Sequence, residues 1–196
     1  GLADVFPTSE DHHAFNNRTL YGTAKMAGEG MARSFADMYG LRYVALRYFN
    51  VYGPRMDIHG KYTEVLIRWL DKIAAGEPPV IYGDGLPTMD LVYIDDVTDA
   101  NITAMESEIT DEVFNVASGT ETSLLGLLTA VLSVMGSVLK PEFLPARAVN
   151  PVPRRLADTR KAEDLLGFKA KVGVEDGLKR LIAWRTEVLA AQSSVV

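Results

Sequence analysis

Residues 20–54, LYGTAKMAGEGMARSFADMYGLRYVALRYFNVYGP, decide the fold class. Apolar side chains recur at helical spacing through residues 20–39, and Gly40 is a suitable residue to end a helix. Residues 41–49 are rich in β-branched and aromatic side chains and run into turn formers at 50–54, which predicts a strand followed by a turn. A helix followed by a strand is typical of an α/β protein with a doubly wound sheet.

Tyr21 and Lys25 begin the predicted helix. Residues four apart lie on the same helix face, one turn from each other. A nearby cation favours the ionised form of a phenol, and a tyrosine activated in this way can exchange a proton with a substrate hydroxyl. Such pairs are also common on surface helices, so the spacing alone favours an incidental pair.

Composition and charge limit the classes of function. The chain has 196 residues, of which 47% are hydrophobic and 23% charged, enough for one sizeable core with an attached lobe. The net charge of −6 and the lack of a basic run argue against nucleic acid as a partner. The sequence has no cysteine, no apolar run long enough to span a bilayer and no basic-then-apolar signal pattern at its start. We expect a cytoplasmic protein without a membrane partner.

The remaining pattern predicts alternating helices and strands with no internal repeat. The predicted helices span residues 62–75, 97–105, 123–135, 158–166 and 174–185, and the predicted strands span residues 80–82, 91–94 and 113–116. The proline-rich segment 141–153 is predicted to be loop or extended chain.

Short strings of residues follow the Tyr21–Lys25 pair in a fixed order. They are Arg47-Tyr48-Phe49-Asn50-Val51-Tyr52-Gly53-Pro54-Arg55, Ile81-Tyr82-Gly83-Asp84-Gly85, Asp90-Leu91-Val92-Tyr93-Ile94-Asp95-Asp96-Val97, Phe114-Asn115-Val116-Ala117, Ala157-Asp158-Thr159-Arg160-Lys161-Ala162 and Leu165-Leu166-Gly167-Phe168. In this order and spacing the set resembles the extended short-chain dehydrogenase/reductases. Within them it is most similar to the NAD-dependent epimerase/dehydratase family that acts on nucleotide sugars, of the UDP-glucose 4-epimerase type. The resemblance covers nearly the whole chain and favours a functional Tyr21–Lys25 pair.

The resemblance implies a partial doubly wound (Rossmann-like) sheet with a smaller α/β substrate-binding lobe. Residues 1–55 would be the remainder of the NAD-binding domain. Residues 56–196 would mainly form the lobe that binds the nucleotide sugar, with about 95–117 returning to the Rossmann sheet.

The family also implies roles for residues of the site. Tyr21 would be the catalytic base. Lys25 would bind the nicotinamide ribose of NAD and favour the phenolate form of Tyr21. Tyr48, Phe49 and Asn50 would line the nicotinamide side of the site.

Six residues are implied as contacts of the nucleotide sugar: Asn50, Val80, Tyr82, Arg147, Arg154 and Arg155. Without the resemblance, Asn50 is equally well a turn residue, Tyr82 a core aromatic residue and the two consecutive arginines a solvated pair. The sequence departs from the family at Met89, where relatives commonly have an arginine that contacts the diphosphate.

Two further pairs receive structural interpretations. Asp95 and Asp96 are predicted to cap a helix rather than to act as catalytic carboxylates. His12 and His13 lie in a loop without clustered partner ligands, so we expect them to be solvated and expect no metal site.

A glycine fingerprint for a dinucleotide is missing from the sequence. Gly28 and Gly30 lie inside a predicted helix, and Gly83-x-Gly85 follows a strand but opens no helix. The family places this fingerprint N-terminal to the Tyr-Lys helix, so we expect the chain to be the C-terminal part of a longer protein. We expect the chain to be the part of an NAD-dependent UDP-sugar 4-epimerase that binds substrate and carries the catalytic pair. We expect it to be inactive by itself.

Three alternatives remain open for the function. Two are enzymes of the same superfamily, a nucleotide-sugar 4,6-dehydratase and a carbonyl reductase, and the third is a non-catalytic binding module that retains the lobe. Relatives dimerise through the Tyr-Lys helix, so a homodimer through residues 20–39 is a further expectation.

Overall fold

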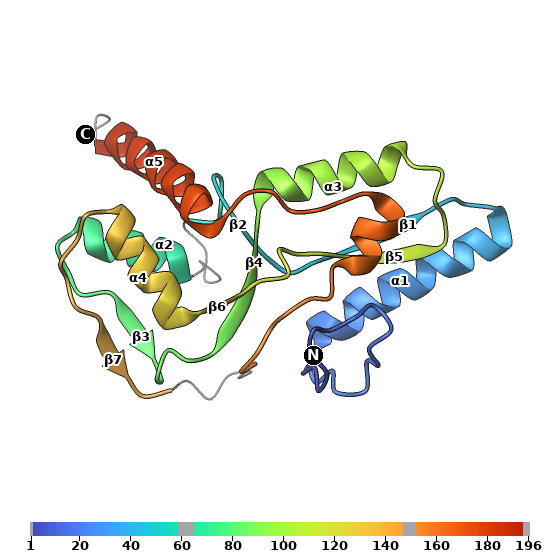
Figure 1. Ribbon diagram of the computed structural model, residues 1–196, viewed down its shortest axis with the longest axis horizontal. Helices are drawn as coiled ribbons and strands as arrows, with labels where there is room; N and C mark the ends of the chain where they lie inside the picture. The colour runs from blue at the N-terminus through green and yellow to red at the C-terminus, as the bar shows by residue number, and fades with distance from the viewer. Residues whose placement is uncertain (1, 59–64, 147–151, 194–196) are drawn as a thin grey trace.

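The computed structural model describes residues 2–58, 65–146 and 152–193. The elements are α1 (Leu20–Tyr39), β1 (Val44–Tyr48), β2 (Asn50–Tyr52), α2 (Val65–Ala74), β3 (Val80–Tyr82), β4 (Thr88–Tyr93), α3 (Ile94–Glu106), β5 (Glu112–Val116), β6 (Glu121–Ser123), α4 (Leu124–Val134), β7 (Glu142–Leu144), the π-helix η1 (Ala162–Leu166) and α5 (Val174–Ser193). They gather into two groups along an elongated molecule, with β4 running between the groups (Figure 1). No helix in the described part of the chain is both long enough and apolar enough to cross a membrane.

The first group is built on a parallel strand pair. β1 pairs with β5 from Val44 opposite Glu112 to Tyr48 opposite Val116. α3 packs on one side of this pair and α1 lies on the other (Figure 1). Eight buried residues form the core of the group: Val92, Val97, Ala100, Phe114, Val116, Ala162, Leu166 and Phe168. The predicted α/β class with parallel strands is confirmed.

The second group contains the larger apolar core. β2 pairs in parallel with β4, β4 pairs antiparallel with β6, and β3 pairs in parallel with β7. α2, α4 and α5 supply most of the remaining buried side chains. Its largest fully buried members are Trp69, Tyr52, Ile67, Ile81, Leu127, Leu128, Leu178, Leu181 and Val131.

Asp90 of β4 joins three segments that are distant in sequence. Its carboxylate is fully buried and accepts hydrogen bonds from Ser118 N and Oγ, Gly119 N and Ala157 N at 2.7–3.1 Å. Burial raises the pKa of Asp90, although these four donors favour the ionised form. Asp90 therefore fixes the loop after β5 and the segment before η1 against β4.

Several predicted boundaries differ from the structure. α1 matches its prediction, ending at Gly40 in the left-handed conformation. The strand predicted at 91–94 begins at Thr88 and ends at Tyr93, because Ile94 already belongs to α3. β2, β6 and β7 were not predicted, β2 falling in the predicted turn at 50–54, since each is a three-residue strand that exists only through its partner strand. Residues 62–64 of the predicted second helix lie outside the described residues.

Gly177 of α5 offers a test of how closely the lobe is packed. A Cβ built on Gly177 would lie 2.1 Å from the hydroxyl of Tyr52, which is itself 1% exposed. We expect Gly177→Ala to lower the free energy of unfolding by about 1–3 kcal/mol in urea denaturation, because an extra methyl overpacks this contact. Gly173→Ala is the control, since nothing lies within 4 Å of a Cβ there. Equal stabilities of the two variants would contradict the expected clash.

Candidate functional site

The start of α1 presents Tyr21 and Lys25 to solvent. Thr19 caps the helix, its side chain accepting a hydrogen bond from Gly22 N at 3.0 Å. Gly22 also lets Asn17 approach closely, because a Cβ at this position would lie 2.2 Å from Asn17 Oδ1. Tyr21 is 74% exposed, and the Nζ atom of Lys25 lies 5.3 Å from the centre of its ring. The phenol and the ammonium therefore share one helix face and are open to a ligand.

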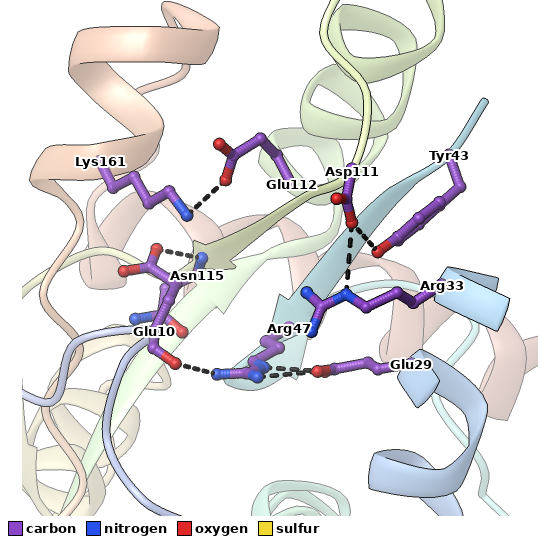
Figure 2. A network of polar contacts seen from close by, with 9 residues as sticks. All are labelled: Glu10, Glu29, Arg33, Tyr43, Arg47, Asp111, Glu112, Asn115 and Lys161. Carbon is purple, nitrogen blue, oxygen red and sulfur yellow. Dashed lines mark hydrogen bonds and ion pairs between the residues drawn. The ribbon is translucent and has the colours of Figure 1, made fainter. Parts of the chain in front are cut away.

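A polar network ties α1 to the strand pair and to the loop before the helix (Figure 2). Arg47 of β1 donates two hydrogen bonds to the carboxylate of Glu29, at 2.8 and 2.7 Å, and a third to the carbonyl oxygen of Glu10 at 2.7 Å. The buried carboxylate of Glu10 accepts a hydrogen bond from Asn115 N of β5 at 2.7 Å. Arg47 lowers the pKa of Glu29, as expected for a carboxylate held by a guanidinium.

A second contact fixes the direction of α1. Arg33 pairs with Asp111, which also accepts a hydrogen bond from the hydroxyl of Tyr43 (Figure 2). Glu29 thus lies near the end of β1 and Arg33 near its beginning, so α1 runs antiparallel to the strand. None of the residues of α1 is buried. The helix is therefore held mainly by these polar contacts.

This antiparallel alignment places the beginning of α1 past the carboxyl end of β1. Tyr21 precedes Glu29 by eight residues, about 12 Å of helix, and Asn50 follows Arg47 by three residues, about 10 Å of strand. Tyr21 and Asn50 are therefore at a similar level beyond the end of β1. The side-chain oxygen of Asn50 is buried and has no hydrogen-bond partner among the described residues. A buried acceptor of this kind is suited to a donor from a ligand.

Tyr48 lies on the other face of the strand pair. Val44, Leu46 and Tyr48 line a groove of about 610 Å³ beside α3, and the Tyr48 hydroxyl donates to Asn101 Oδ1 at 2.8 Å. Arg47, the neighbouring residue, points to α1 instead. The structure does not bring Tyr48 to Tyr21. The backbone N–H of Phe49 still donates to Val116 O, so Phe49 continues the first strand pair toward Asn50.

Val80 and Tyr82 lie in β3, in the second group (Figure 1). The Nε1 atom of Trp69 donates to the carbonyl oxygen of Val80 at 2.7 Å, which uses one backbone group of the strand internally. Tyr82 is 40% exposed, which argues against the alternative interpretation of this residue as a core aromatic. Its exposure leaves the ring accessible to a ligand.

Arg154 is bound to Glu121. Its guanidinium makes two hydrogen bonds to the Glu121 carboxylate, both 2.7 Å, and lies 4.6 Å from the centre of the Phe6 ring. The guanidinium lowers the pKa of Glu121 to about 2, and the Thr88 hydroxyl contributes a further hydrogen bond. Arg155 is half-buried.

Two other positions bear on the predicted diphosphate site. Arg147 lies outside the described residues. Met89, the position at which the family resemblance led us to expect an arginine, packs against the apolar core of the second group.

The Glu121–Arg154 pair should make stability depend on pH. Because the folded-state pKa of Glu121 is depressed from 4.5 to about 2, the carboxylate stabilises the fold above pH 4.5 and loses this contribution as the pH falls toward 2. We expect Glu121→Gln to have a lower urea midpoint than the parent chain at neutral pH and the same midpoint near pH 2. Glu142→Gln controls for loss of one negative charge on a three-residue strand. A midpoint difference that persists at pH 2 would contradict this origin.

The predicted helix cap at Asp95 and Asp96 is wrong. The N-cap residue of α3 is Tyr93, and both aspartates lie in the first turn of the helix. The buried Asp96 accepts hydrogen bonds from the backbone N–H groups of Lys171 and Val172 at 2.9 and 3.1 Å. Asp95 pairs with Arg180. Sequence could not show this, because the partners follow some 75 residues later.

The statement that His12 and His13 lack a nearby ligand is also wrong. Asp4, eight residues before His12, folds back so that its two carboxylate oxygens contact one Nε2 atom of each histidine. A turn of the loop, rather than a recognisable sequence spacing, brings the three side chains together.

Sequence reasoning missed the residues that position α1. Glu10, Glu29 and Arg47 carry the network of Figure 2, yet none was predicted as a site residue. A signal existed, since Glu29 lies four residues after Lys25 and Arg47 begins the string that contains Asn50. Charges on a predicted helix and on the strand that follows it are candidates for a pair across the two elements.

The fold and site together define part of a doubly wound α/β protein with a Tyr-x-x-x-Lys helix beside its parallel strands. The model of the NAD dependent epimerase/dehydratase family matches residues 2–117. Among curated proteins, the chain is 34% identical over 94% of its length to a putative UDP-glucose 4-epimerase of Methanocaldococcus jannaschii and 35% identical over 93% to a UDP-glucose 4-epimerase of Mycolicibacterium smegmatis. It spans 58% and 57% of the length of these relatives.

Solved structures give the same assignment. A UDP-N-acetylglucosamine 4-epimerase of Methanobrevibacter ruminantium, in complex with UDP-N-acetylmuramic acid, superposes with a TM-score of 0.90 at 33% identity, covering 96% of this chain and 60% of that one. A UDP-glucose 4-epimerase of Thermotoga maritima with UDP-glucose gives 0.88 at 37% identity, covering 95% and 59%. The chain belongs to the NAD-dependent epimerase/dehydratase family.

Proposed function

We propose that the chain is the catalytic and substrate-binding part of an NAD-dependent UDP-sugar 4-epimerase. The observation that carries this proposal is the position of Tyr21 and Lys25 beyond the end of β1, level with Asn50. The buried side-chain oxygen of Asn50, without a partner among the described residues, supports a ligand donor at this place. A buried acceptor left unpaired costs about 1–3 kcal/mol, which a sugar-nucleotide donor would recover.

The chemistry of the proposed step follows from this placement. When bound, NAD supplies the acceptor for a hydride from the sugar and later returns it. Tyr21 takes the proton of the 4-hydroxyl as the hydride leaves C4, which produces a 4-keto sugar. Tyr21 gives the proton back when the hydride returns to the opposite face of that carbon. Lys25 favours the phenolate through its positive charge. Tyr21, Lys25, Phe49 and Asn50 would line the nicotinamide and sugar end of the site.

The nucleotide end of the substrate is proposed to lie on the second group. Val80 and Tyr82 would hold the base, and Arg147, Arg154 and Arg155 would supply donors to the diphosphate. Arginine suits this role because its donors match two oxygens at once. Arg154 would exchange the Glu121 carboxylate for a diphosphate oxygen pair, a like-for-like replacement of one bidentate acceptor by another.

The decisive experiment compares two polypeptides. One is the 196-residue chain, for which we expect neither tight NAD binding in calorimetry nor conversion of UDP-glucose to UDP-galactose, since its sequence has no pyrophosphate loop. The other joins this chain to the part of the Mycolicibacterium smegmatis relative that the match leaves out. We expect the joined protein to bind NAD and to turn over.

The outcomes separate the proposed function from its rivals. A 4-keto-6-deoxy product from the joined protein would indicate a dehydratase. Binding of UDP-glucose without any turnover would indicate a non-catalytic module. Micromolar NAD binding with turnover by the 196-residue chain alone would contradict the argument from the missing loop.

We propose a homodimer through the outer face of α1. Met31, Phe35 and Met38 share this face, opposite Glu29 and Arg33, and are 61%, 48% and 71% exposed. An apolar helix face of this kind favours self-association. We expect a dimer in sedimentation velocity at high concentration, and at least about tenfold weaker association in Phe35→Glu, because a buried unpaired charge is costly. A monomer at every concentration would contradict this proposal.

A further inference from the structure

Three metal-ligating side chains meet in the loop before α1. The Nε2 atom of His12 lies 2.6 Å from Asp4 Oδ1, and the Nε2 atom of His13 lies 3.2 Å from Asp4 Oδ2. The two imidazole rings stack, with centroids 4.6 Å apart and an interplanar angle of 27°. One ligand atom from each residue can be chosen so that all three lie within 4.8 Å of one another. Two imidazoles thus turn the same nitrogen toward one carboxylate.

We infer that Asp4, His12 and His13 form a binding site for a divalent transition-metal ion, with Zn²⁺ as the representative. Two imidazoles and one carboxylate suit Zn²⁺ and its first-row neighbours, whereas Mg²⁺ and Ca²⁺ prefer oxygen ligands throughout. Ligand atoms around a tetrahedral Zn²⁺ are roughly 3.4 Å apart, given bonds of about 2.0–2.2 Å. The contact of His13 with Asp4, 3.2 Å, is close to this spacing. The contact of His12, 2.6 Å, must open by several tenths of an ångström.

The loop that carries the ligands is anchored between them. Thr8 donates its N–H to Leu156 O at 2.8 Å and accepts from Asp158 N at 2.9 Å. Glu10 accepts from Asn115 N, which fixes the residues just before the histidines. These bonds hold the stretch between Asp4 and His12 against distant parts of the chain. Part of the ordering that metal binding requires is therefore already present in the fold.

The exposure of the three side chains gives the ion a route of entry. The His12 side chain is only 11% exposed and is held in place, whereas Asp4 and His13 are 54% and 53% exposed. Three protein ligands leave a fourth tetrahedral position open to water or to another ligand. The ion would join Asp4 to the two histidines and so close the loop ahead of the helix that carries Tyr21.

The first test measures metal binding to the 196-residue chain. Titration calorimetry with Zn²⁺ at neutral pH should show one ion bound per chain, and Mg²⁺ should give no heat of binding. Co²⁺ in place of Zn²⁺ should give the visible absorption of a four-coordinate site. Asp4→Asn, His12→Asn and His13→Asn should each weaken Zn²⁺ binding at least about tenfold.

Matched controls make the assignment specific. Asp11→Asn removes a neighbouring carboxylate of the same loop, and His59→Asn removes the third histidine of the sequence. Both should bind Zn²⁺ like the parent chain. In the parent chain, the side-chain NMR signals of His12 and His13 should shift with Zn²⁺ while those of His59 stay unchanged, a readout that needs no variant to fold.

Three results would overturn the inference. These are no Zn²⁺ binding by the folded parent chain, parental Zn²⁺ affinity in all three of Asp4→Asn, His12→Asn and His13→Asn, and a loss of binding in His59→Asn as large as that in His12→Asn. None of these readouts depends on catalysis, so failure of the proposed epimerase function leaves this test intact.

Discussion

Tyr21→Phe should lower the turnover of UDP-glucose by the protein that joins this chain to the remaining part of its relative by about 10²–10⁴-fold, the usual contribution of a positioned acid–base group. The substitution removes only the hydroxyl that would take the proton of the sugar, and the side chain is 74% exposed, so it costs little stability. Turnover of UDP-glucose is the measurement, and NAD binding should stay nearly unchanged.

Tyr39→Phe is the matched control for this substitution. Tyr39 is on the same helix, is 69% exposed, and lies five turns away from Tyr21 at the other end of α1. Its loss of a hydroxyl should leave turnover at the level of the parent protein. If the turnover of Tyr21→Phe is within about twofold of that of Tyr39→Phe, Tyr21 is ruled out as the proton-transfer group, because so small a change is far short of the usual effect.

Asp90→Asn should lower the free energy of unfolding by about 3 kcal/mol. The N–H groups of Gly119 and Ala157 both donate to Asp90 Oδ2. An asparagine amide nitrogen at that place would present hydrogens to these two donors, so both would lose their acceptor, whereas the asparagine oxygen could still accept from Ser118. Urea denaturation of the 196-residue chain at neutral pH measures the change.

Asp99→Asn is the control for the loss of charge. Its carboxylate is 55% exposed and pairs with the exposed Lys171, which precedes α5, so the change should stay within about 0.5 kcal/mol. Equal unfolding curves for the two variants would show that the four hydrogen bonds of Asp90 do not hold the segments together. A large loss of unfolding free energy confined to Asp90→Asn would establish that Asp90 holds these segments together.

The sequence predicted the elements whose signal is local. The apolar spacing and Gly40 located α1, and the β-branched run located β1, because helix capping and side-chain alternation act over a few residues. β2, β6 and β7 were missed, since three-residue strands depend on a partner strand. Asp96 was misassigned for the same reason, because its two hydrogen-bond donors lie in a segment after η1.

In the candidate site, too, local features could be predicted from sequence and tertiary contacts could not. Tyr21 and Lys25 were found from their spacing and from the family resemblance, and the structure places them side by side. Strand alternation implies that Arg47 and Tyr48 face opposite sides of β1, but no local pattern showed that Arg47 meets α1, that Tyr48 meets α3 or that Asp4 folds back onto His12. These arrangements depend on tertiary contacts between segments, which no local pattern encodes.

The attachment of α1 through Glu29–Arg47 and Arg33–Asp111, without a buried side chain, has a consequence for its dynamics. The free energy that holds this helix against the strands is largely electrostatic, so dissolved salt weakens it while leaving the apolar cores almost untouched. Local opening of α1 is then a separate equilibrium from global unfolding. Ionic strength becomes a means of detaching the Tyr21–Lys25 helix, and hydrogen exchange would register that release before any strand opens.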